Sequence, residues 1–529
     1  MNRTTSGTVG SRRWWALGGV TLAVLAVSMD VTILSVALPT LAGALSATAA
    51  DLQWFSAGYA LVLAALTLPA GWLGDRLGRK RVLMGSLLVF AAGSAACAYA
   101  GSAAWFVVAR MLLGVGGAGV VVMAVSALTV LFDDAERPRA VAVWGAANLV
   151  AFPVGPILGG WLLSHVWWGW VFLLNVPVSL LGLAAVAAWV PESSADRPPR
   201  LDGVGLVASS AGLAALTWGF IQAGQDGWSS ARAWALMVTG LLALVGFGGW
   251  EARLARRGGQ PLVDPALFRS ASFSWGVTLF AVLTLALIGL IFALPQYFQA
   301  VLGTDPQGSG LRLLPLVGGL LVGLGPSRAL AVRVGVKTTV AAGFVVLAAG
   351  LAIGATTTTA SGTGFAALWT AVSGVGTGMV MATVAAAALA EIPAERAGVG
   401  SAVMQAVKGV GAPLGAAVLG SVLAAGYRNH LPVVTTPGGA GEAMRANVFA
   451  GLRVARQLHD AQLGRQVQAA FVHGVTGTLL VSLAVAVAGA VLAVLFLPRR
   501  AAVVPAPGGD AVQGVAADRV PGDVPASTR

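Results

Sequence analysis

Long apolar runs follow one another along most of this chain, and they constrain its fold more than any other feature. A helix rises about 1.5 Å per residue, so about 20 apolar residues cross a hydrocarbon layer of roughly 30 Å. Helices also satisfy their own backbone hydrogen bonds, which lipid cannot do. The runs are continuous rather than alternating in polarity, which argues against a membrane β-barrel. The sequence therefore predicts an all-α membrane protein.

Composition supports this fold class. Of the 529 residues, 57% are hydrophobic and only 10% are charged, against about 25% charged in a typical soluble domain. We predict fourteen membrane-spanning helices, so that both termini lie on one side. The predicted spans are 15–38, 51–73, 82–101, 104–131, 140–163, 171–190, 203–222, 233–251, 272–294, 309–327, 338–357, 363–389, 399–424 and 470–497.

Basic residues gather in every second loop between the predicted spans. They include Arg76, Arg79, Lys80, Arg81, Arg137, Arg139, Arg197, Arg200, Arg253, Arg256, Arg257, Arg269, Arg328, Arg333, Lys337 and Arg396. Short loops on the cytoplasmic side of a membrane carry this excess, so the pattern predicts that both termini are cytoplasmic. The same loops explain the net charge of +12, and we expect no nucleic-acid partner.

The loop after the second predicted span reads Gly-Trp-Leu-Gly-Asp-Arg-Leu-Gly-Arg-Lys-Arg over 71–81. Glycines permit a tight turn and a close approach of two helices. One acidic and several basic side chains can form a charge clasp that holds the inward side shut and breaks when that side opens. The residues of this predicted gating loop are Gly71, Asp75, Arg76, Gly78, Arg79 and Lys80.

The fifth predicted span contains a second motif, Gly155-Pro156-Ile-Leu-Gly159-Gly160. Gly155 and Gly159 have the small-xxx-small spacing that lets two membrane helices approach closely. Pro156 frees a backbone carbonyl and permits a bend. A packing kink accounts for these residues without any further role.

With the first span, these stretches resemble a known family. Segment 29–39 reads Met-Asp-Val-Thr-Ile-Leu-Ser-Val-Ala-Leu-Pro, and 170–177 reads Trp-Val-Phe-Leu-Leu-Asn-Val-Pro. Together with the gating loop, they resemble the fourteen-span drug:proton antiporter family of the major facilitator superfamily. In that superfamily, the pattern at Gly155, Pro156, Gly159 and Gly160 is the antiporter motif of exporters.

The resemblance implies two six-helix bundles with two helices inserted between them. The expected organisation is a cytoplasmic segment 1–14, a first bundle 15–190, inserted helices with their loops 191–271, a second bundle 272–497 and a disordered tail 498–529. The second bundle includes an extracellular segment, 425–469. Its part from Glu442 to Gln468 has a helical amphipathic pattern, which fits either a helix on the membrane surface or a solvated loop.

Asp30 and Arg110 are ionisable residues inside predicted spans. Counting along the first and fourth spans places both in the outer half of the membrane at similar depth, so we predict that they are electrostatically coupled. A charge in hydrocarbon is costly and usually faces a cavity or a partner. We interpret Asp30 as the carboxylate that carries the coupled proton. The alternative is a static structural ion pair.

Further polar and aromatic side chains in the spans are candidates for a substrate cavity. They are Trp54, Tyr59, Asn148, Gln296, Tyr297, Gln405 and Lys408. Lys408 lies near the predicted midplane, where substrate contact, charge pairing and packing all remain open roles.

The sequence favours a transporter over an enzyme, because its four histidines are widely scattered. Lys80 and Lys408 lack the following hydroxyl residue of a phosphate-binding loop, and Lys337-Thr338 is preceded by Val336 rather than by glycine. We therefore expect no ATP, no other cofactor and no metal, only a proton gradient. We predict a monomeric, multi-pass protein of the bacterial inner membrane that exports small amphipathic organic compounds. A lipid or a single dedicated metabolite as cargo, or nutrient symport on the same fold, are the alternatives.

Overall fold

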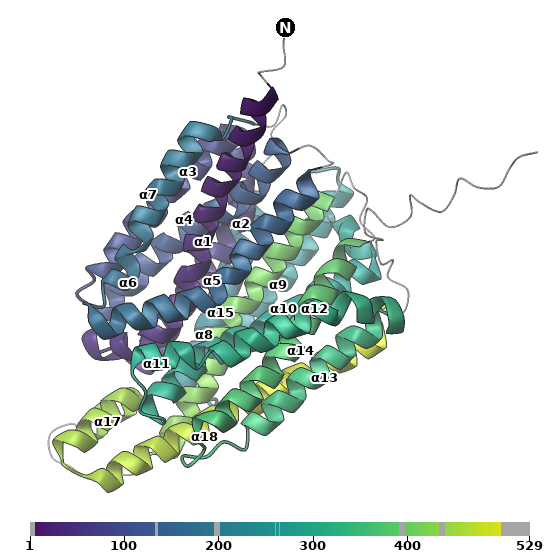
Figure 1. Ribbon diagram of the computed structural model, residues 1–529. Helices are drawn as coiled ribbons and strands as arrows, with labels where there is room; N and C mark the ends of the chain where they lie inside the picture. Colours follow the sequence, from purple (N-terminus) through teal and green to yellow (C-terminus); the bar gives the residue numbers. More distant parts are fainter. Residues whose placement is uncertain are drawn as a thin grey trace, which may run out of the picture.

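The computed structural model describes residues 6–132, 136–194, 202–259, 261–263, 265–390, 397–432 and 440–498. Every regular element in these segments is a helix (Figure 1). Thirteen of the helices are long and apolar enough to cross a membrane, which confirms the predicted fold class. A helix also covers the remaining predicted span, 140–163, and the count of fourteen spans remains a prediction. The predicted tail beyond residue 498 lies outside the described residues.

The first bundle is built from the helices of the first six predicted spans. They are α1 (Ser6–Ala44), α2 (Ala49–Leu77), α3 (Arg79–Ala98), α4 (Ala103–Leu131), α5 (Arg137–His165), α6 (Trp170–Leu173) and α7 (Asn175–Trp189). Helix α1 packs against α5 and α7, α3 packs against α4 and α7, and α2 packs against α4. Thr48 and Asp51 form a capping box that starts α2, and the Ser102 hydroxyl accepts a hydrogen bond from Trp105 N at the start of α4.

The second bundle repeats this arrangement. Its helices are α10 (Ala271–Ala300), α11 (Pro306–Leu311), α12 (Leu314–Val334), α13 (Val336–Gly354), α14 (Thr363–Ala390), α15 (Ala397–Asn429) and α18 (Ala461–Phe496). Helix α10 packs against α14, α15 and α18, and α14 also packs against α12 and α13. A short 3-10 helix (Pro265–Arg269) precedes α10.

Two predicted spans are broken helices. The sixth, 171–190, is divided between α6 and α7, and the tenth, 309–327, is divided between α11 and α12. Proline has no N–H, so it cannot donate to the carbonyl four residues earlier. Pro177 therefore cannot donate a hydrogen bond to the carbonyl of Leu173, where α6 ends. Pro315 likewise cannot donate to the carbonyl of Leu311, where α11 ends.

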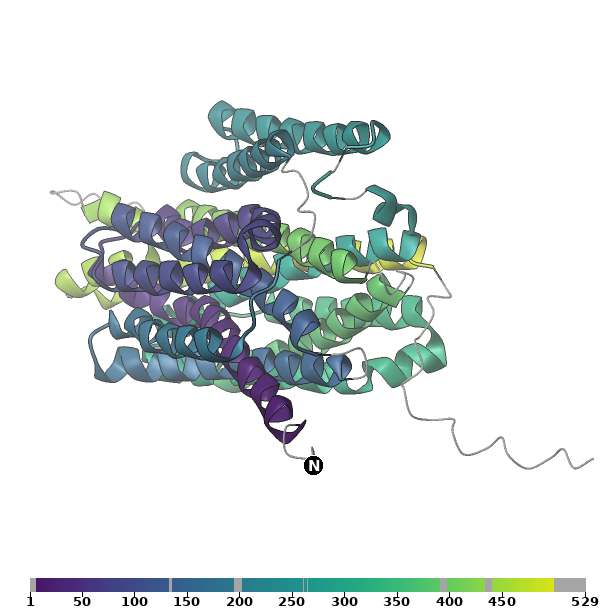
Figure 2. The same cartoon turned by 90° about the horizontal axis from the view of Figure 1, so that it is seen from above.

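The inserted helices α8 (Gly203–Asp226) and α9 (Ala231–Arg256) form a hairpin that lies along one side of the bundles (Figure 2). Asp202 accepts a hydrogen bond from Gly205 N, and Ser230 accepts one from Ala233 N, so both helices begin with a capped N-terminus. Helix α8 packs against α2 of the first bundle and α15 of the second. The hairpin therefore covers the seam between the two bundles.

Hydrogen bonds across the seam gather at one end of the molecule. This end, which we call the α17 end, carries the α1–α2 turn, the loop between α10 and α11, and α17 (Val448–Gln457). Gln299 Nε2 donates to Val36 O at 3.1 Å, and Gln307 N donates to Ser164 Oγ at 3.3 Å. The two bundles are therefore joined to each other at the α17 end.

The segment predicted as an extracellular loop, 425–469, is mostly helical in its described part. Helix α15 continues to Asn429, α18 begins at Ala461, and α16 (Ala440–Ala446) and α17 lie between them. The amphipathic pattern is thus confirmed, but the solvated-loop interpretation is wrong for the described residues. Val448, Val454 and Ala455 of α17 are buried, and the helix packs against α1, α10 and α18. Its apolar face is covered by protein.

Candidate functional site

The predicted neighbours Asp30 and Arg110 meet between α1 and α4. Arg110 Nη1 lies 2.5 Å from Asp30 Oδ2, and each side chain is only 1% exposed. Arg110 also donates from Nε to Phe55 O of α2 at 3.0 Å. Its guanidinium lies over the Tyr59 ring, 4.5 Å from the ring centroid. The spatial coupling expected from their similar depth is therefore present.

A side chain from α7 completes the surroundings of the carboxylate. Asn175 Nδ2 donates to Asp30 Oδ1 at 3.2 Å and to Ser94 Oγ at 3.1 Å. Ser94 Oγ in turn donates to Phe172 O at 2.7 Å. Asn175 stands at the start of α7, directly after the break that Pro177 imposes, so its position follows from the broken sixth span. Each oxygen of Asp30 thus has a donor.

This network is buried rather than open to a cavity. Bringing a carboxylate and a guanidinium out of water is costly, and only their mutual attraction and further hydrogen bonds compensate for it. Removing either charge leaves the other unpaired.

The glycines of the fifth predicted span face two different partners. A Cβ at Gly155 would overlap Thr32 Oγ1, and one at Gly159 would lie 3.0 Å from Ile33, so α5 and α1 touch beside Asp30. A Cβ at Gly160 would lie 2.6 Å from Pro306 O on α11. The expected close helix approach is present. It joins α5 to α1 within the first bundle and to α11 across the seam.

The loop between α2 and α3 carries the predicted gating residues. Gly78 has a φ of 103°, a conformation that favours glycine, and it separates the two helices. Asp75 pairs with Arg79 at 2.9 Å, and Lys80 Nζ donates to Ala187 O at 2.7 Å.

The other basic residues of this loop also have partners nearby. Arg76 lies over the Trp72 ring, and Arg81 pairs with Glu192 at 3.6 Å. Among the described residues, these contacts all lie within the first bundle. The clasp that holds the inward side shut therefore remains a prediction.

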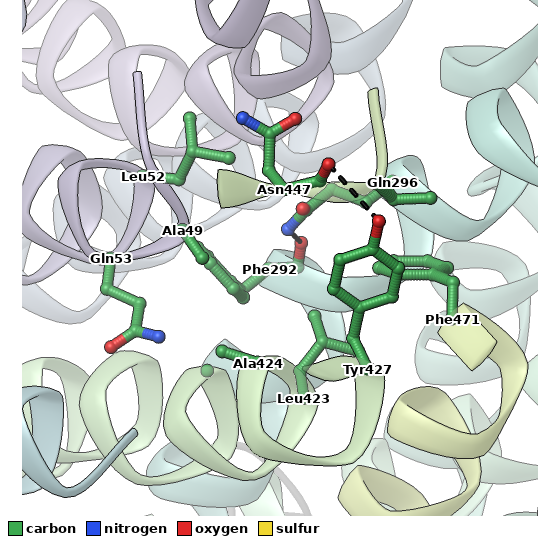
Figure 3. Close-up of a pocket in the computed structure, with 12 residues that line it drawn as sticks. Ala49, Leu52, Gln53, Phe292, Gln296, Leu423, Ala424, Tyr427, Asn447 and Phe471 are labelled. Carbon is green, nitrogen blue, oxygen red and sulfur yellow. Dashed lines mark hydrogen bonds between the residues drawn. The ribbon is translucent and has the colours of Figure 1, made fainter. Parts of the chain in front are cut away.

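The predicted cavity residues do not converge on one place. Trp54 packs with Ile221 of α8 and Ala416 of α15, whereas Tyr59 belongs to the Asp30 network. Tyr297 is buried, and its hydroxyl has no hydrogen-bond partner. Gln296 lines a pocket at the α17 end (Figure 3). The side chains of Asn148, Gln405 and Lys408 lie outside the described part of the structure.

Several polar residues of these sites are absent from the sequence-based set. Asn175 and Ser94 surround Asp30, and Asn447 Nδ2 donates across the seam to Ala47 O at 2.5 Å. The only sequence signal for Asn175 was its place in segment 170–177, which resembles the antiporter family. A neutral side chain in an apolar span does not stand out by itself. In the described segments, no three His, Cys, Asp or Glu side chains are placed to hold a metal ion.

Comparison with known proteins supplies the family. Residues 20–416 match the family described as Major Facilitator Superfamily. The chain is 35% identical over 422 residues to the Tetracenomycin C resistance and export protein of Streptomyces glaucescens, covering 80% of this chain and 78% of that protein. It is 34% identical over 499 residues to the Multidrug efflux pump LfrA of Mycolicibacterium smegmatis, covering 92% and 97%.

Solved structures agree with this fold. A bacterial homologue of the human lysosomal transporter Spinster, in an inward-facing and unoccupied conformation, has a TM-score of 0.63 at 16% identity, covering 92% of this chain and 97% of that one. A D-xylose-proton symporter has a TM-score of 0.58 at 15% identity, covering 92% and 98%. At these identities the likeness concerns the fold alone.

Proposed function

Because the chain belongs to the major facilitator superfamily, a family of membrane transporters, we propose that it is a proton-coupled antiporter that exports small amphipathic organic compounds across the cell membrane. Its relatives include an antibiotic resistance and export protein and a multidrug efflux pump, which supports efflux as the direction of transport. The observation that carries proton coupling is the buried pair of Asp30 and Arg110. The transporter acts as a monomer with no bound cofactor.

The proposed mechanism uses the Asp30 network as a two-state element. In the ionised state, Asp30 holds Arg110 on α4 and Asn175 on α7 against α1. Protonation cancels the charge of the carboxylate and weakens both contacts, which lets α1 and its neighbours in the first bundle shift. Cargo and proton thus bind to different conformations, and the two bundles rock about the seam between them.

The closed α17 end fits the first stage of such a cycle. Because the bundles are joined at that end, we infer that the cargo site opens toward the opposite end, where α2 and α3 meet in the gating loop. We place this opposite end in the cytoplasm, as the basic loops predict. Export then requires the contacts at the α17 end to open and those at the gating loop to close.

Efflux from cells tests the proposal. The protein is expressed in a drug-sensitive bacterium without its own major pumps, and loss of a panel of dyes and antibiotics is followed with and without a protonophore. We expect efflux in the wild type, its loss with the protonophore, and its loss in Asp30→Asn at equal protein abundance. Asp226→Asn, on an exposed carboxylate at the end of α8, is the matched control and should retain efflux.

Three results would count against the proposal. Efflux that survives both the protonophore and Asp30→Asn removes Asp30 from the coupling step. Uptake instead of efflux would support symport, and inactivity towards the whole panel would favour a lipid or one dedicated metabolite as cargo.

A further inference from the structure

Two acidic side chains are buried together where the hairpin of α8 and α9 opens, at the end opposite the turn that joins the two helices. Asp202 directly precedes α8, and Glu251 lies in the last two turns of α9. Their exposed fractions are 8% and 3%. Buried carboxylates are normally paired with a base, but in the described part of the chain neither of these two forms an ion pair.

The two carboxyl groups are close neighbours. Both Asp202 Oδ2 and Glu251 Oε1 would overlap a Cβ on Gly205, so the missing side chain of this glycine leaves the room that they share. The groups are within hydrogen-bonding reach of each other, and Asp202 is the charged side chain of the described residues that acts on Glu251. A hydrogen bond between two carboxyl groups needs a proton on one of them.

The surrounding donors leave one oxygen without a partner. Asp202 Oδ1 accepts from Gly205 N at 3.0 Å, and its Oδ2 accepts from Trp250 Nε1 at 2.8 Å. Glu251 Oε2 accepts from Val263 N at 3.0 Å, whereas Glu251 Oε1 has no partner. Donors at both oxygens of Asp202 favour its ionised form. The proton therefore belongs on Glu251 Oε1, from which it can be donated to Asp202 Oδ2.

A proton fits this place better than a metal ion does. Two adjacent carboxylates out of water repel each other, so one of them holds a proton. A calcium ion would need about six to eight oxygen ligands. In the described segments, no third His, Cys, Asp or Glu joins the pair to supply them. A proton needs only one donor atom and one acceptor atom, which are both present.

The pair also connects the hairpin to the second bundle. Val263, whose N–H bonds Glu251, belongs to the segment between α9 and α10. Its side chain packs against a buried apolar cluster of α10, α14, α15 and the 3-10 helix, which includes Phe273 and Leu267. The start of α8, the end of α9 and this connecting segment therefore meet at the two carboxyl groups.

We propose that Asp202 and Glu251 form a second proton-binding site, in which one shared proton fastens the α8–α9 hairpin to the second bundle. Loss of that proton to water leaves two adjacent negative charges, which push the end of α9 away from the start of α8 and weaken the bond to Val263. The proton is not carried across the membrane. The site is separate from Asp30, and it does not depend on the proposed export function.

Infrared spectroscopy of the purified protein detects a protonated carboxyl group directly. In the wild type at neutral pH, we expect a C=O band of a carboxylic acid that is absent from Glu251→Gln and that disappears as the pH rises. Asp226→Asn is the matched control, because it removes an exposed carboxylate from the other end of α8. This variant should keep the band and its dependence on pH.

Thermal unfolding from about pH 5 to about pH 9 supplies a second readout. A glutamate in the unfolded chain releases its proton above about pH 4.3, whereas the folded pair keeps it. The folded protein then binds one proton more than the unfolded chain, so its stability falls as the pH rises until the pair loses the proton. Glutamine at 251 donates permanently to Asp202, so the Tm of Glu251→Gln should fall less with rising pH and exceed that of the wild type at the alkaline end.

A second variant keeps the test decisive if Glu251→Gln does not fold. Asp202→Asn removes one of the two charges, so its Tm should also depend less on pH than that of the wild type. It should lie below the wild-type Tm at acid pH, because Trp250 Nε1 then loses an ionised acceptor. Asp226→Asn should follow the wild-type curve.

Three results would overturn the proposal. They are the absence of a carboxylic acid band that depends on Glu251, equal pH dependence of the Tm in the wild type and in both variants of the pair, and loss of the band with a rise of the Tm when calcium, magnesium, sodium or potassium is added at constant pH. The last would assign the site to a metal ion. None of them bears on export, because Asp30 is intact in every variant, and a failure of proton-driven efflux would leave the second proton site standing.

Discussion

At the scale of single residues, the proposed coupling depends on a carboxylate and a guanidinium that are both buried and that satisfy each other. Asp30 and Arg110 are each 1% exposed, and Asn175 supplies the second donor to the carboxylate. A buried pair of this kind is expensive to break, because truncating one partner strands the other charge. The same property would make it suitable as the proposed switch, since a proton on Asp30 would change the charge balance between α1 and α4.

A double-mutant cycle measures this mutual dependence. Asp30→Leu and Arg110→Leu should each destabilise the protein by about 3–5 kcal/mol, because each leaves one unpaired buried charge. The double variant should be more stable than either single variant, since neither charge remains. Thermal unfolding of the purified proteins supplies the comparison. Additive losses in the double variant would show that the two charges do not interact.

Asn175 gives a second residue-scale prediction. Asn175→Ala removes the donor to Asp30 Oδ1, so we expect a loss of about 1–3 kcal/mol of stability together with reduced transport. Ser179→Ala on the same helix is the control, because the buried Ser179 hydroxyl has no partner. That variant should be as stable as the wild type or more stable. Equal behaviour of the two variants would remove Asn175 from the network.

At the scale of elements, α5 connects the Asp30–Arg110 pair to the seam. Gly155 and Gly159 let α5 lie against α1 beside Asp30, and Gly160 lets it lie against α11 of the second bundle. A movement of α1 can therefore reach the other bundle through a single helix. This gives the antiporter motif a packing role that does not depend on the residues being chemically reactive.

Substitution of these glycines tests that role. Gly155→Ala should destabilise the protein by about 1–3 kcal/mol, because its methyl group overlaps Thr32. Gly145→Ala on the same helix is the control, since a Cβ there meets nothing within 4 Å. The control should be neutral or slightly stabilised, and it should transport normally. A Gly155→Ala protein with unchanged Tm and transport would refute the close packing of α5 and α1.

The elements also show what sequence reasoning could and could not predict. Periodicity and length were enough for the spans, because a membrane helix needs only a long apolar run. The breaks at Leu174 and Arg312 were missed, since an apolar run looks continuous even where Pro177 or Pro315 removes a hydrogen bond. The place of α17 against the bundle was missed as well, because an amphipathic pattern does not say what covers its apolar face.

The candidate site was predictable in part for a similar reason. Asp30 and Arg110 stand out because charges are rare in apolar spans, and counting residues gave their depth. Asn175 and Ser94 are neutral, so only the three-dimensional packing singles them out. The proposed cavity residues Trp54, Tyr59 and Gln296 share a polar or aromatic character but not a location, which composition alone could not resolve.

At the scale of the whole molecule, the two bundles are joined at the α17 end, and the hairpin of α8 and α9 covers their seam. Alternating access requires the join to open once in each cycle. The contact between Ser164 of α5 and the backbone of Gln307 lies across this join. It is therefore a suitable place to lock the molecule.

A crosslink there should stop transport. In a Cys97→Ser background, Ser164→Cys with Gln307→Cys should lose transport on oxidation and recover it on reduction. His430→Cys with His473→Cys is the control, because these stacked side chains lie at the same end but within the second bundle. That pair should transport whether oxidised or reduced. Normal transport by a fully crosslinked Ser164–Gln307 pair would show that this end stays closed during the cycle.

The most direct test of the central claim is the proton flux that accompanies the exported compound. Purified protein is placed in liposomes with a trapped pH indicator, and a compound that cells export is added without any imposed gradient. Proton antiport predicts a compound-dependent change of internal pH in the wild type, and none in Asp30→Asn protein that still binds the compound. Movement of the compound by the wild type without any change of internal pH would contradict proton antiport.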